Sequence, residues 1–193
     1  MKNAFALAAA LSLSACATNG LVPANQTVTA AKRLVVTPPS AWNKLPRYAD
    51  ALPQEENWTK NGAVLDSISF FGGVESGGAL TRQRRKADQQ VPVYRVGMTP
   101  PELTGMVESY YRVRGGVTQF TPTTVEPIAF LGTTGIAMDF DYLTGDDVRR
   151  KGRAVMAEVG GRLYLMTLDG TRSHYFDAAR PDFDAMVVGA RVG

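Results

Sequence analysis

The sequence contains one cysteine and one histidine among its 193 residues. A single thiol excludes an internal disulfide, so a folded domain must be stabilised by an ordinary hydrophobic core. One histidine and one thiol also exclude the usual zinc sites, which take several such ligands. Basic and acidic residues are nearly balanced, at 21 and 18, and this balance gives no reason to expect nucleic-acid binding.

No apolar run at the start of the chain is long enough to span a membrane. Residues 4–13 are apolar, but they make up only about half of the ~20 residues that a membrane-spanning helix needs. Because Lys2 supplies a short basic region before them, residues 1–15 are predicted to be a secretory signal peptide. Its removal takes away Lys2 and no acidic residue, which leaves 20 basic and 18 acidic side chains.

The cysteine directly follows this segment. The sequence LSAC at residues 13–16 resembles the lipobox of bacterial lipoproteins, with an aliphatic residue, two small residues and a cysteine. The resemblance implies that the Cys16 thiol carries diacylglycerol, that the chain is cut before it, and that the new amine is acylated, for example with palmitate. Ala17 and Thr18 lack the acidic residue that commonly retains such proteins in the inner membrane. The resemblance therefore implies an outer-membrane anchor, with the protein facing the periplasm.

Two alternatives stay open for this cysteine. Ala15-Cys16-Ala17 also fits the A-x-A pattern of ordinary signal peptidase, which would cut after Ala17 and release a soluble periplasmic protein. A buried structural cysteine is disfavoured by the N-terminal position.

Acylation of Cys16 would fix the protein at the membrane. A protein with more than one acyl chain is held on a bilayer almost permanently, at about 0.8 kcal/mol per buried methylene.

The mature chain is predicted to have one flexible part and one domain. Residues 16–33 comprise the lipidated cysteine and a small, polar stretch without a sustained period, which predicts a flexible tether. Residues 34–193, roughly 160 in number, suit a single domain with a sizeable core.

Short elements are predicted at the start of this domain. Residues 34–36 form a β-rich run, and the three-residue spacing of Trp42, Leu45 and Tyr48 indicates a short helix or turn. Residues 58–65 carry a hairpin signal, because Asn61-Gly62 within them favours a type I′ turn, and the return strand is predicted to run from Ser67 to Phe71. The glycine pairs that follow are expected to permit turns; they are Gly72-Gly73 and Gly77-Gly78.

A helix start is encoded by Thr99-Pro100-Pro101-Glu102. Threonine at the N-cap, proline at the first helical position and glutamate three residues on form a capping box. An apolar face follows, and Gly115-Gly116 ends the helix, which is predicted to lie on a sheet. The residues of that face are Leu103, Met106, Val107 and Tyr110.

The sheet itself is predicted in the second half of the chain. Alternation of apolar and polar residues, with Asp139 and Asp141 on the polar face, is typical of a half-buried strand. Four strands joined by short turns predict an antiparallel meander, and helical spacing predicts a closing helix over residues 177–192. The four strands are residues 127–131, 135–142, 153–159 and 162–168.

This order of elements resembles the PsbP-like α/β/α sandwich across residues 34–192. Gly132, Gly135, the Gly152 turn and Leu163-Tyr164-Leu165 also resemble the pattern of small bacterial lipoproteins. The predicted fold class is α+β, a single domain with an antiparallel meander flanked by helices. Members of this fold mostly act as binding or assembly proteins, so the resemblance implies a non-catalytic binding or assembly role. Together with the predicted anchor on Cys16, this role implies an envelope protein as partner.

Candidate catalytic residues are few. His174, with Asp177 and a serine not identified, could form the site of an envelope hydrolase, although the G-x-S-x-G turn is missing. Alternatively, His174 packs at a strand end with a hydrogen bond to the backbone. No cofactor is predicted.

Charged clusters offer the remaining candidates. Asp139 with Asp141, or Asp146 with Asp147, could bind calcium or magnesium, but alternating aspartates are also the usual solvent face of a strand. Two basic clusters are predicted to be solvated loops or, near a lipid anchor, to meet anionic head groups of the membrane. A domain that binds a small ligand or a lipid therefore stays open as an alternative. The clusters are Arg82, Arg84, Arg85 and Lys86, and Arg149, Arg150, Lys151 and Arg153.

Overall fold

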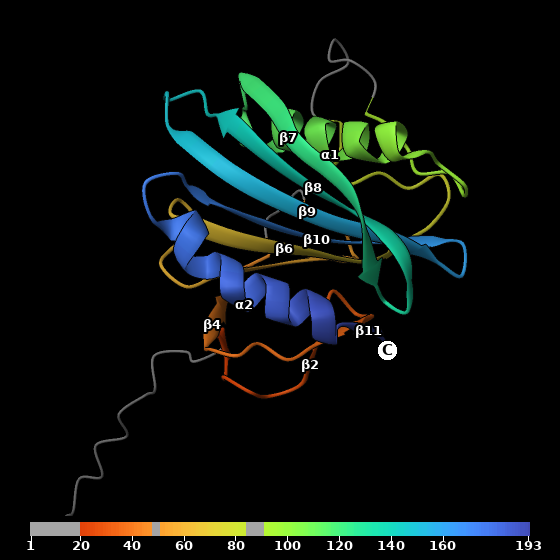
Figure 1. The fold of residues 1–193 in the computed structure, drawn as a ribbon, viewed down its shortest axis with the longest axis horizontal. Helices are drawn as coiled ribbons and strands as arrows, with labels where there is room; N and C mark the ends of the chain where they lie inside the picture. Colours follow the sequence, from red (N-terminus) through yellow and green to blue (C-terminus); the bar gives the residue numbers. More distant parts are fainter. Residues whose placement is uncertain (1–19, 48–50, 84–90) are drawn as a thin grey trace, which may run out of the picture.

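The computed structural model describes residues 20–47, 51–83 and 91–193. These residues form an α/β/α sandwich in which an eight-stranded antiparallel sheet is covered by one helix on each face (Figure 1). The predicted fold class, an α+β domain with an antiparallel sheet flanked by helices, is confirmed. Within the described ranges, no helix has both the length and the hydropathy needed to cross a membrane.

The large sheet has the strand order β1-β4-β5-β6-β10-β9-β8-β7. Its strands are Leu21–Val22 (β1), Trp42–Lys44 (β4), Glu55–Thr59 (β5), Asp66–Val74 (β6), Gln119–Phe130 (β7), Thr133–Leu143 (β8), Arg149–Val159 (β9) and Arg162–Thr171 (β10). A small sheet of order β11-β3-β2 consists of Val28–Ala30 (β2), Leu34–Val36 (β3) and Arg191–Val192 (β11).

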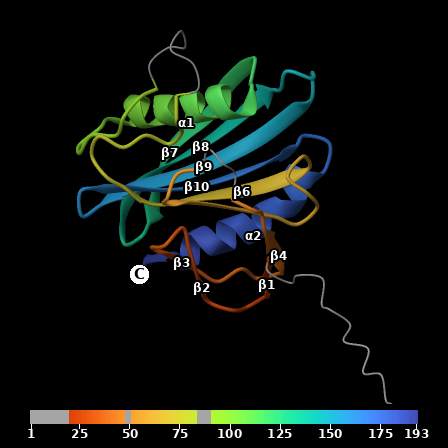
Figure 2. The same ribbon diagram turned by 180° about the vertical axis from the view of Figure 1, so that it is seen from behind.

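Each face of the large sheet has its own hydrophobic core. Helix α1 (Pro100–Gly115) packs on one face, and helix α2 (Tyr175–Gly189) packs on the other together with the small sheet (Figure 2). Because side chains alternate along a strand, neighbouring residues of β10 belong to different cores: Leu165 faces α1 and Met166 faces α2. A strand covered on both sides must therefore be apolar at nearly every position.

The four predicted strands of the meander are confirmed as β7 to β10. β8 begins two residues earlier than predicted, at Thr133, and two other strands begin at least four residues earlier. β7 begins at Gln119 and β9 begins at Arg149. In both extensions, polar residues continue the ladder, as when Arg149 pairs with Leu143 of β8. Backbone pairing with a neighbouring strand thus decides the strand ends, where the side chains give a weak signal.

The predicted helix start at Thr99 is confirmed in α1. The backbone N–H of Thr99 donates to Glu102 Oε2 at 2.7 Å, and Gly116, whose φ of 60° is left-handed, caps the C-terminal end of the helix. The predicted apolar face is buried against the sheet. The closing helix also exists, but α2 begins at Tyr175 and ends at Gly189, and the last residues pair with β3 as strand β11.

The predicted flexible tether over residues 16–33 is wrong from residue 20 onward. Val22 on β1 is fully buried, and Ala30 at the end of β2 has no exposed surface. These small apolar side chains can be buried because β1 pairs with β4 and β2 pairs with β3, which packs against α2. Residues 16–19 lie outside the described ranges.

Three local predictions before α1 are also corrected. Trp42 begins strand β4 rather than a helix, and Tyr48 lies outside the described residues. The hairpin between β5 and β6 is confirmed, but residues 60–65 form its loop, so the turn is longer than a type I′ turn. Gly72-Gly73 lies inside β6, where a Cβ at Gly72 would meet the Ala31 carbonyl oxygen at 2.0 Å. Close backbone approach, not a turn, requires glycine there.

One carboxylate joins three distant parts of the chain on the α2 side. Asp182 Oδ2 accepts hydrogen bonds from Ser40 Oγ at 2.5 Å and Trp42 Nε1 at 3.2 Å, and it lies 2.6 Å from Lys60 Nζ. Burial acts to raise the pKa of Asp182, but the hydrogen bonds and the charge of Lys60 prevail and lower this pKa below its usual value. The charged form of Asp182 therefore stabilises the docking of α2 on the N-terminal segment.

Asp182→Asn is expected to lower the free energy of unfolding at pH 7 by about 1–2 kcal/mol, because hydrogen bonds to a charged acceptor are lost. A lowered folded-state pKa contributes stability above the unfolded pKa of about 4, and this contribution disappears as the pH falls through the folded pKa. The difference between wild type and variant should therefore shrink in urea unfolding curves recorded from pH 7 down to pH 3.

Asp177→Asn is the matched control, since Asp177 makes an exposed ion pair with Lys151. Its effect should be small at every pH. An Asp182→Asn difference that stays constant with pH would contradict the proposed role of the charge.

Candidate binding pocket

A cavity of about 370 Å³ lies on the α1 side of the sheet. It exists because α1 ends at Gly115 while the strands beneath it continue, so the end of the sheet is left without a helix. The loop after β5 and the loop before β9 form the rim of this opening. The residues that line it are Asn57, Ala63, Val64, Ser67, Ser69, Tyr110, Tyr111, Arg114, Gly115, Tyr142, Thr144, Asp146, Val148, Arg150 and Asp169. We call it the α1 pocket.

An ion pair between β9 and β10 forms the floor of the α1 pocket. Arg150 Nη2 lies 2.5 Å from Asp169 Oδ2, and both residues are buried, at 6% and 8% exposure. The Tyr142 hydroxyl accepts a hydrogen bond from Arg150 Nε at 2.7 Å and donates one to Asp169 Oδ2 at 2.9 Å. Arg150 also donates to the carbonyl of Val64, which ties the loop after β5 to the floor.

The protonation states of the two tyrosines and of Arg150 on this floor are fixed near neutral pH. Burial is the main cause, and the charge of Asp169 the second, that raises the pKa values of Tyr111 and Tyr142 well above the usual tyrosine value. Both hydroxyls therefore remain donors. Burial acts to lower the pKa of Arg150, but the pairing with Asp169 and Tyr142 outweighs it, so the net direction is upward and the guanidinium stays charged.

A second ion pair lies at the C-terminal end of α1. Arg114 Nη1 is 2.5 Å from Glu55 Oε1, whose side chain is fully buried, and Asn57 Nδ2 donates to the same oxygen at 2.9 Å. The Tyr110 hydroxyl lies 3.3 Å from Ser69 Oγ. The pocket therefore holds two arginines that are each paired with a carboxylate, surrounded by hydroxyl and amide groups.

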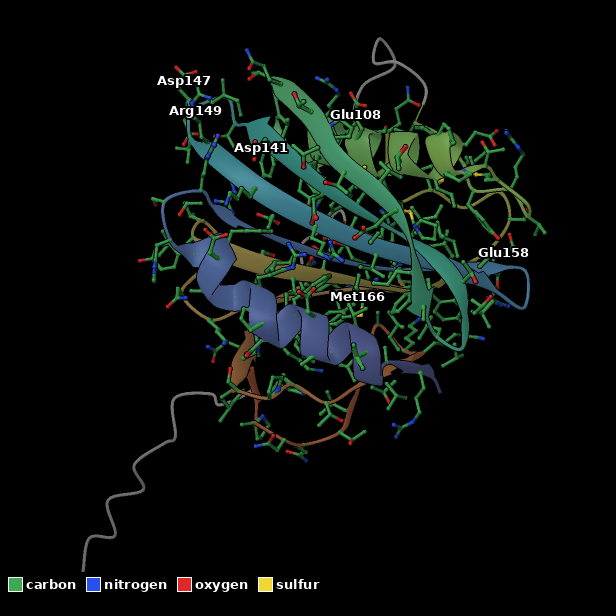
Figure 3. The ribbon with its side chains drawn as sticks, in the orientation of Figure 1. Glu108, Asp141, Asp147, Arg149, Glu158 and Met166 are labelled. Atoms are coloured by element: carbon green, nitrogen blue, oxygen red, sulfur yellow. The ribbon has the colours of Figure 1, made fainter. Side chains whose placement is uncertain are left out.

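The rim of the α1 pocket is more apolar and more exposed than its floor. Val64 is 77% exposed and Val148 is 37% exposed. Asp146, on the same loop as Val148, accepts a hydrogen bond from Thr144 Oγ1, which lowers the pKa of Asp146. Asp141, Asp147 and Arg149 lie at this end of the sheet (Figure 3). A bound group would thus meet apolar contacts at the entrance and polar contacts below.

The residues predicted as a catalytic site lie outside the α1 pocket. His174 is exposed just before α2, and its carbonyl accepts a hydrogen bond from the Ala178 N–H. Asp177 pairs with Lys151, the two atoms Oδ1 and Nζ being 3.1 Å apart. The structure therefore joins Asp177 to a lysine rather than to the imidazole.

Three of the four aspartates considered for a metal, Asp139, Asp141 and Asp146, contact a cation or a hydroxyl instead. Asp139 faces α2, not open solvent, and its Oδ2 lies 2.9 Å from Arg153 Nη1, while Arg180 Nη1 lies 3.3 Å from its other oxygen. Asp141 Oδ2 lies 3.8 Å from Arg172. In the part of the chain that the structure describes, no group of three or more histidine, cysteine, aspartate or glutamate side chains is placed to hold a metal.

The second basic cluster was predicted to be a solvated loop, and this prediction is wrong. Residues 149–153 belong to β9, and Arg150 and Arg153 are each only 6% exposed. Arg150 faces α1 and Arg153 faces α2, because they are three residues apart on a strand. Of the first cluster, Arg82 is exposed, whereas Arg84, Arg85 and Lys86 lie outside the described residues, as does Cys16.

The α1 pocket was not predicted from the sequence. One signal for it exists in β9. The side chains that face α1 recur at every second residue, and this alternation extends back to an arginine at the start of the strand. The residues are Arg150, Gly152, Ala154 and Met156. Gly152 also leaves room where a Cβ would lie 2.2 Å from the Phe140 ring. The partner Asp169 could not have been identified from residues near it in sequence.

Comparisons with known proteins identify the fold. No protein-family model matches the chain, and no curated protein sequence matches it. The solution structure of cyanobacterial PsbP (CyanoP) from Synechocystis sp. PCC 6803 is similar, with a TM-score of 0.58 and 15% sequence identity over 94% of this chain and 98% of that chain. The predicted PsbP-like fold is thus confirmed.

A weaker match is to LpqN of Mycobacterium tuberculosis, which is described as involved in cell envelope biogenesis. Its TM-score is 0.34 and its sequence identity is 10%, over 90% of this chain and 79% of that chain. At this TM-score the match adds nothing to the fold assignment.

Asp169→Asn is expected to lower the free energy of unfolding by about 3–5 kcal/mol, because it leaves the buried Arg150 without its counter-charge. The double variant Arg150→Met/Asp169→Leu should recover part of this loss, since no unpaired charge stays buried. Chemical denaturation of the single and double variants measures both effects.

Glu108→Gln provides the control, because Glu108 makes an exposed ion pair with Arg112 on α1. It should cost less than about 1 kcal/mol. If Asp169→Asn cost no more than this control, the floor of the pocket would not be an electrostatically coupled cluster.

Proposed function

We propose that this protein is a lipoprotein of the bacterial outer membrane, facing the periplasm, that binds another envelope component without catalysis. The α1 pocket is the proposed binding site. The observation that supports it is a cavity with a fixed, buried hydrogen-bonding floor beneath an exposed apolar rim.

The charges of the pocket indicate the kind of group that it accepts. Arg150 is paired with Asp169 and Arg114 with Glu55, so neither arginine offers an uncompensated charge to an anion. Asp146 adds one exposed carboxylate at the rim. We therefore expect the pocket to take a neutral or zwitterionic polar group, bound by hydrogen bonds, with Val64 and Val148 contacting the rest of the partner.

The groups on the floor favour binding over catalysis. The tyrosine hydroxyls stay protonated and the guanidinium of Arg150 stays charged across the neutral range, so they are suited to hydrogen bonding rather than to proton transfer. His174, the candidate for a hydrolase, is not among the residues that line the pocket.

The proposed anchor would hold the domain close to the bilayer. Gly20 is the first described residue and lies four residues after Cys16. Four residues span at most about 14 Å even when fully extended. With Cys16 acylated, the N-terminal strands would lie next to the lipid head groups rather than at the end of a long tether.

Mass spectrometry of the amino-terminal peptide tests the anchor. The peptide from membrane-purified protein is expected to begin at Cys16 and to carry the mass of a diacylglyceryl group and an amide-linked acyl chain. A peptide that begins at Thr18 without acyl mass would show that ordinary signal peptidase processes the chain and that the protein is released.

Photo-crosslinking in intact envelopes tests the pocket. A photoreactive residue in place of Val64, at the rim, is expected to give a discrete crosslinked product. The same residue in place of Val188, which is 86% exposed on α2, is the matched control and should not give it.

A pocket-filling variant makes this test specific. Ser67→Phe places a ring in the pocket without removing any group of the Arg150–Asp169 pair, and it should abolish the product at Val64. Identical products from both positions, or a product that survives Ser67→Phe in a folded protein, would argue against binding at the α1 pocket.

A further inference from the structure

A second cavity, of about 380 Å³, lies at the opposite end of β6 and β10 from the α1 pocket. It is formed by the turn between β2 and β3, the end of β6 with the loop after it, and the start of β10. The residues that line it are Lys32, Arg33, Pro53, Gln54, Gly72, Gly73, Glu75, Ser76, Gly78 and Arg162. We call it the basic notch.

The charges of the basic notch are not balanced. Its lining contains the cations Lys32, Arg33 and Arg162 against the single carboxylate of Glu75. That carboxylate lies 2.5 Å from Arg162 Nη1, so it is already paired. Lys32 and Arg33 are exposed, and within the described ranges neither makes an ion pair. The notch therefore has a net positive charge, unlike the α1 pocket.

The backbone that carries these two cations is strained. Ala31 and Lys32 have positive φ angles of 47° and 71°, a left-handed conformation that is unfavourable for a residue with a side chain. The turn persists because its backbone packs on β6, where Gly72 leaves room for the Ala31 carbonyl. Such strain is often kept where it positions functional groups, and here it places Lys32 and Arg33 at the notch.

The surrounding layer is also basic. Residues 20–47 contain the four cations Lys32, Arg33, Lys44 and Arg47 and no acidic residue. Both views of the ribbon place this red-to-orange segment along the side of the sandwich that is remote from α1 (Figures 1 and 2). It is also the segment that follows Cys16 most closely in the chain. Under the proposed anchor, this layer is the part of the domain nearest the membrane.

We propose that the basic notch binds a phosphate group, and that this phosphate is the head group of an anionic phospholipid in the leaflet that carries the anchor. Arginine guanidinium groups match phosphate oxygens with two parallel hydrogen bonds, and lysine adds a compact charge. Each cation near an anionic surface contributes about 1 kcal/mol. The lipid source rests on the proposed anchor, whereas the phosphate chemistry of the notch does not.

Vesicle binding by the processed chain tests the proposal. The chain from residue 16 with Cys16→Ser carries no acyl group, so its binding reports the domain alone. It should bind vesicles of phosphatidylglycerol and phosphatidylcholine, but not of phosphatidylcholine alone, and the binding should weaken with salt. Lys32→Gln/Arg33→Gln should bind about 30-fold more weakly, as expected for two charges at an anionic surface.

Two further variants separate the notch from net charge and from folding. Arg95→Gln/Arg112→Gln removes the same charge from exposed positions at α1 and should change the affinity less than about threefold. Lys32→Gly removes one notch cation but relieves a positive φ, so it should raise the thermal stability while weakening vesicle binding. Equal losses in the two double variants would overturn the notch as a specific site.

A soluble phosphate distinguishes the two sources of the ligand. If the head group is the ligand, glycerol 3-phosphate at millimolar concentration should compete only weakly with phosphatidylglycerol vesicles. Tight binding of glycerol 3-phosphate that depends on Lys32 and Arg33, without preference for anionic vesicles, would overturn the lipid source and retain the phosphate site. Absence of both interactions would overturn the proposal. None of these outcomes depends on whether Cys16 is acylated in the cell.

Discussion

Two guanidinium groups on one strand are buried on opposite faces of the sheet, and their neutralisation organises much of the molecule. Arg150 of β9 meets Asp169 on the α1 side of the sheet, and Arg153 meets Asp139 on the α2 side. An unpaired buried charge costs several kcal/mol, so each face must supply a carboxylate. Asp184 of α2 lies 3.4 Å from Arg153 Nε and helps to fix where α2 docks. On the other face, the same requirement leaves a polar floor that α1 does not cover.

The parts of the fold that could be predicted have strong local signals. The capping box at Thr99 fixes the start of α1 through contacts within four residues, and glycine at the end fits a left-handed φ. The meander has long strands with sustained alternation and short Gly-Gly or loop connections, so strand identity and antiparallel pairing follow from nearby residues. The arrangement of the helices on the two faces of the sheet was predicted from the resemblance of the element order to PsbP-like proteins.

The parts that could not be predicted depend on contacts between distant residues. β1 and β2 have only two and three residues, and their side chains resemble those of a linker. They become strands because β4, β3 and α2 offer pairing and burial. Likewise, Arg149 to Arg153 look solvated in isolation, and only the ladder with β8 and β10 makes them part of a strand. Both candidate sites combine residues from several strands and loops that are far apart in the sequence, so no short sequence motif could identify them.

The way in which the chain enters the sheet has a mechanical consequence. β1 is joined to β4 by only two residue pairs, Leu21 with Asn43 and Val22 with Trp42, at the outer edge of the large sheet. A force that pulls on the amino terminus loads this short ladder before any other, while Val22 resists extraction from the core. β1 can thus act as a weak link that yields under tension and spares the meander behind it.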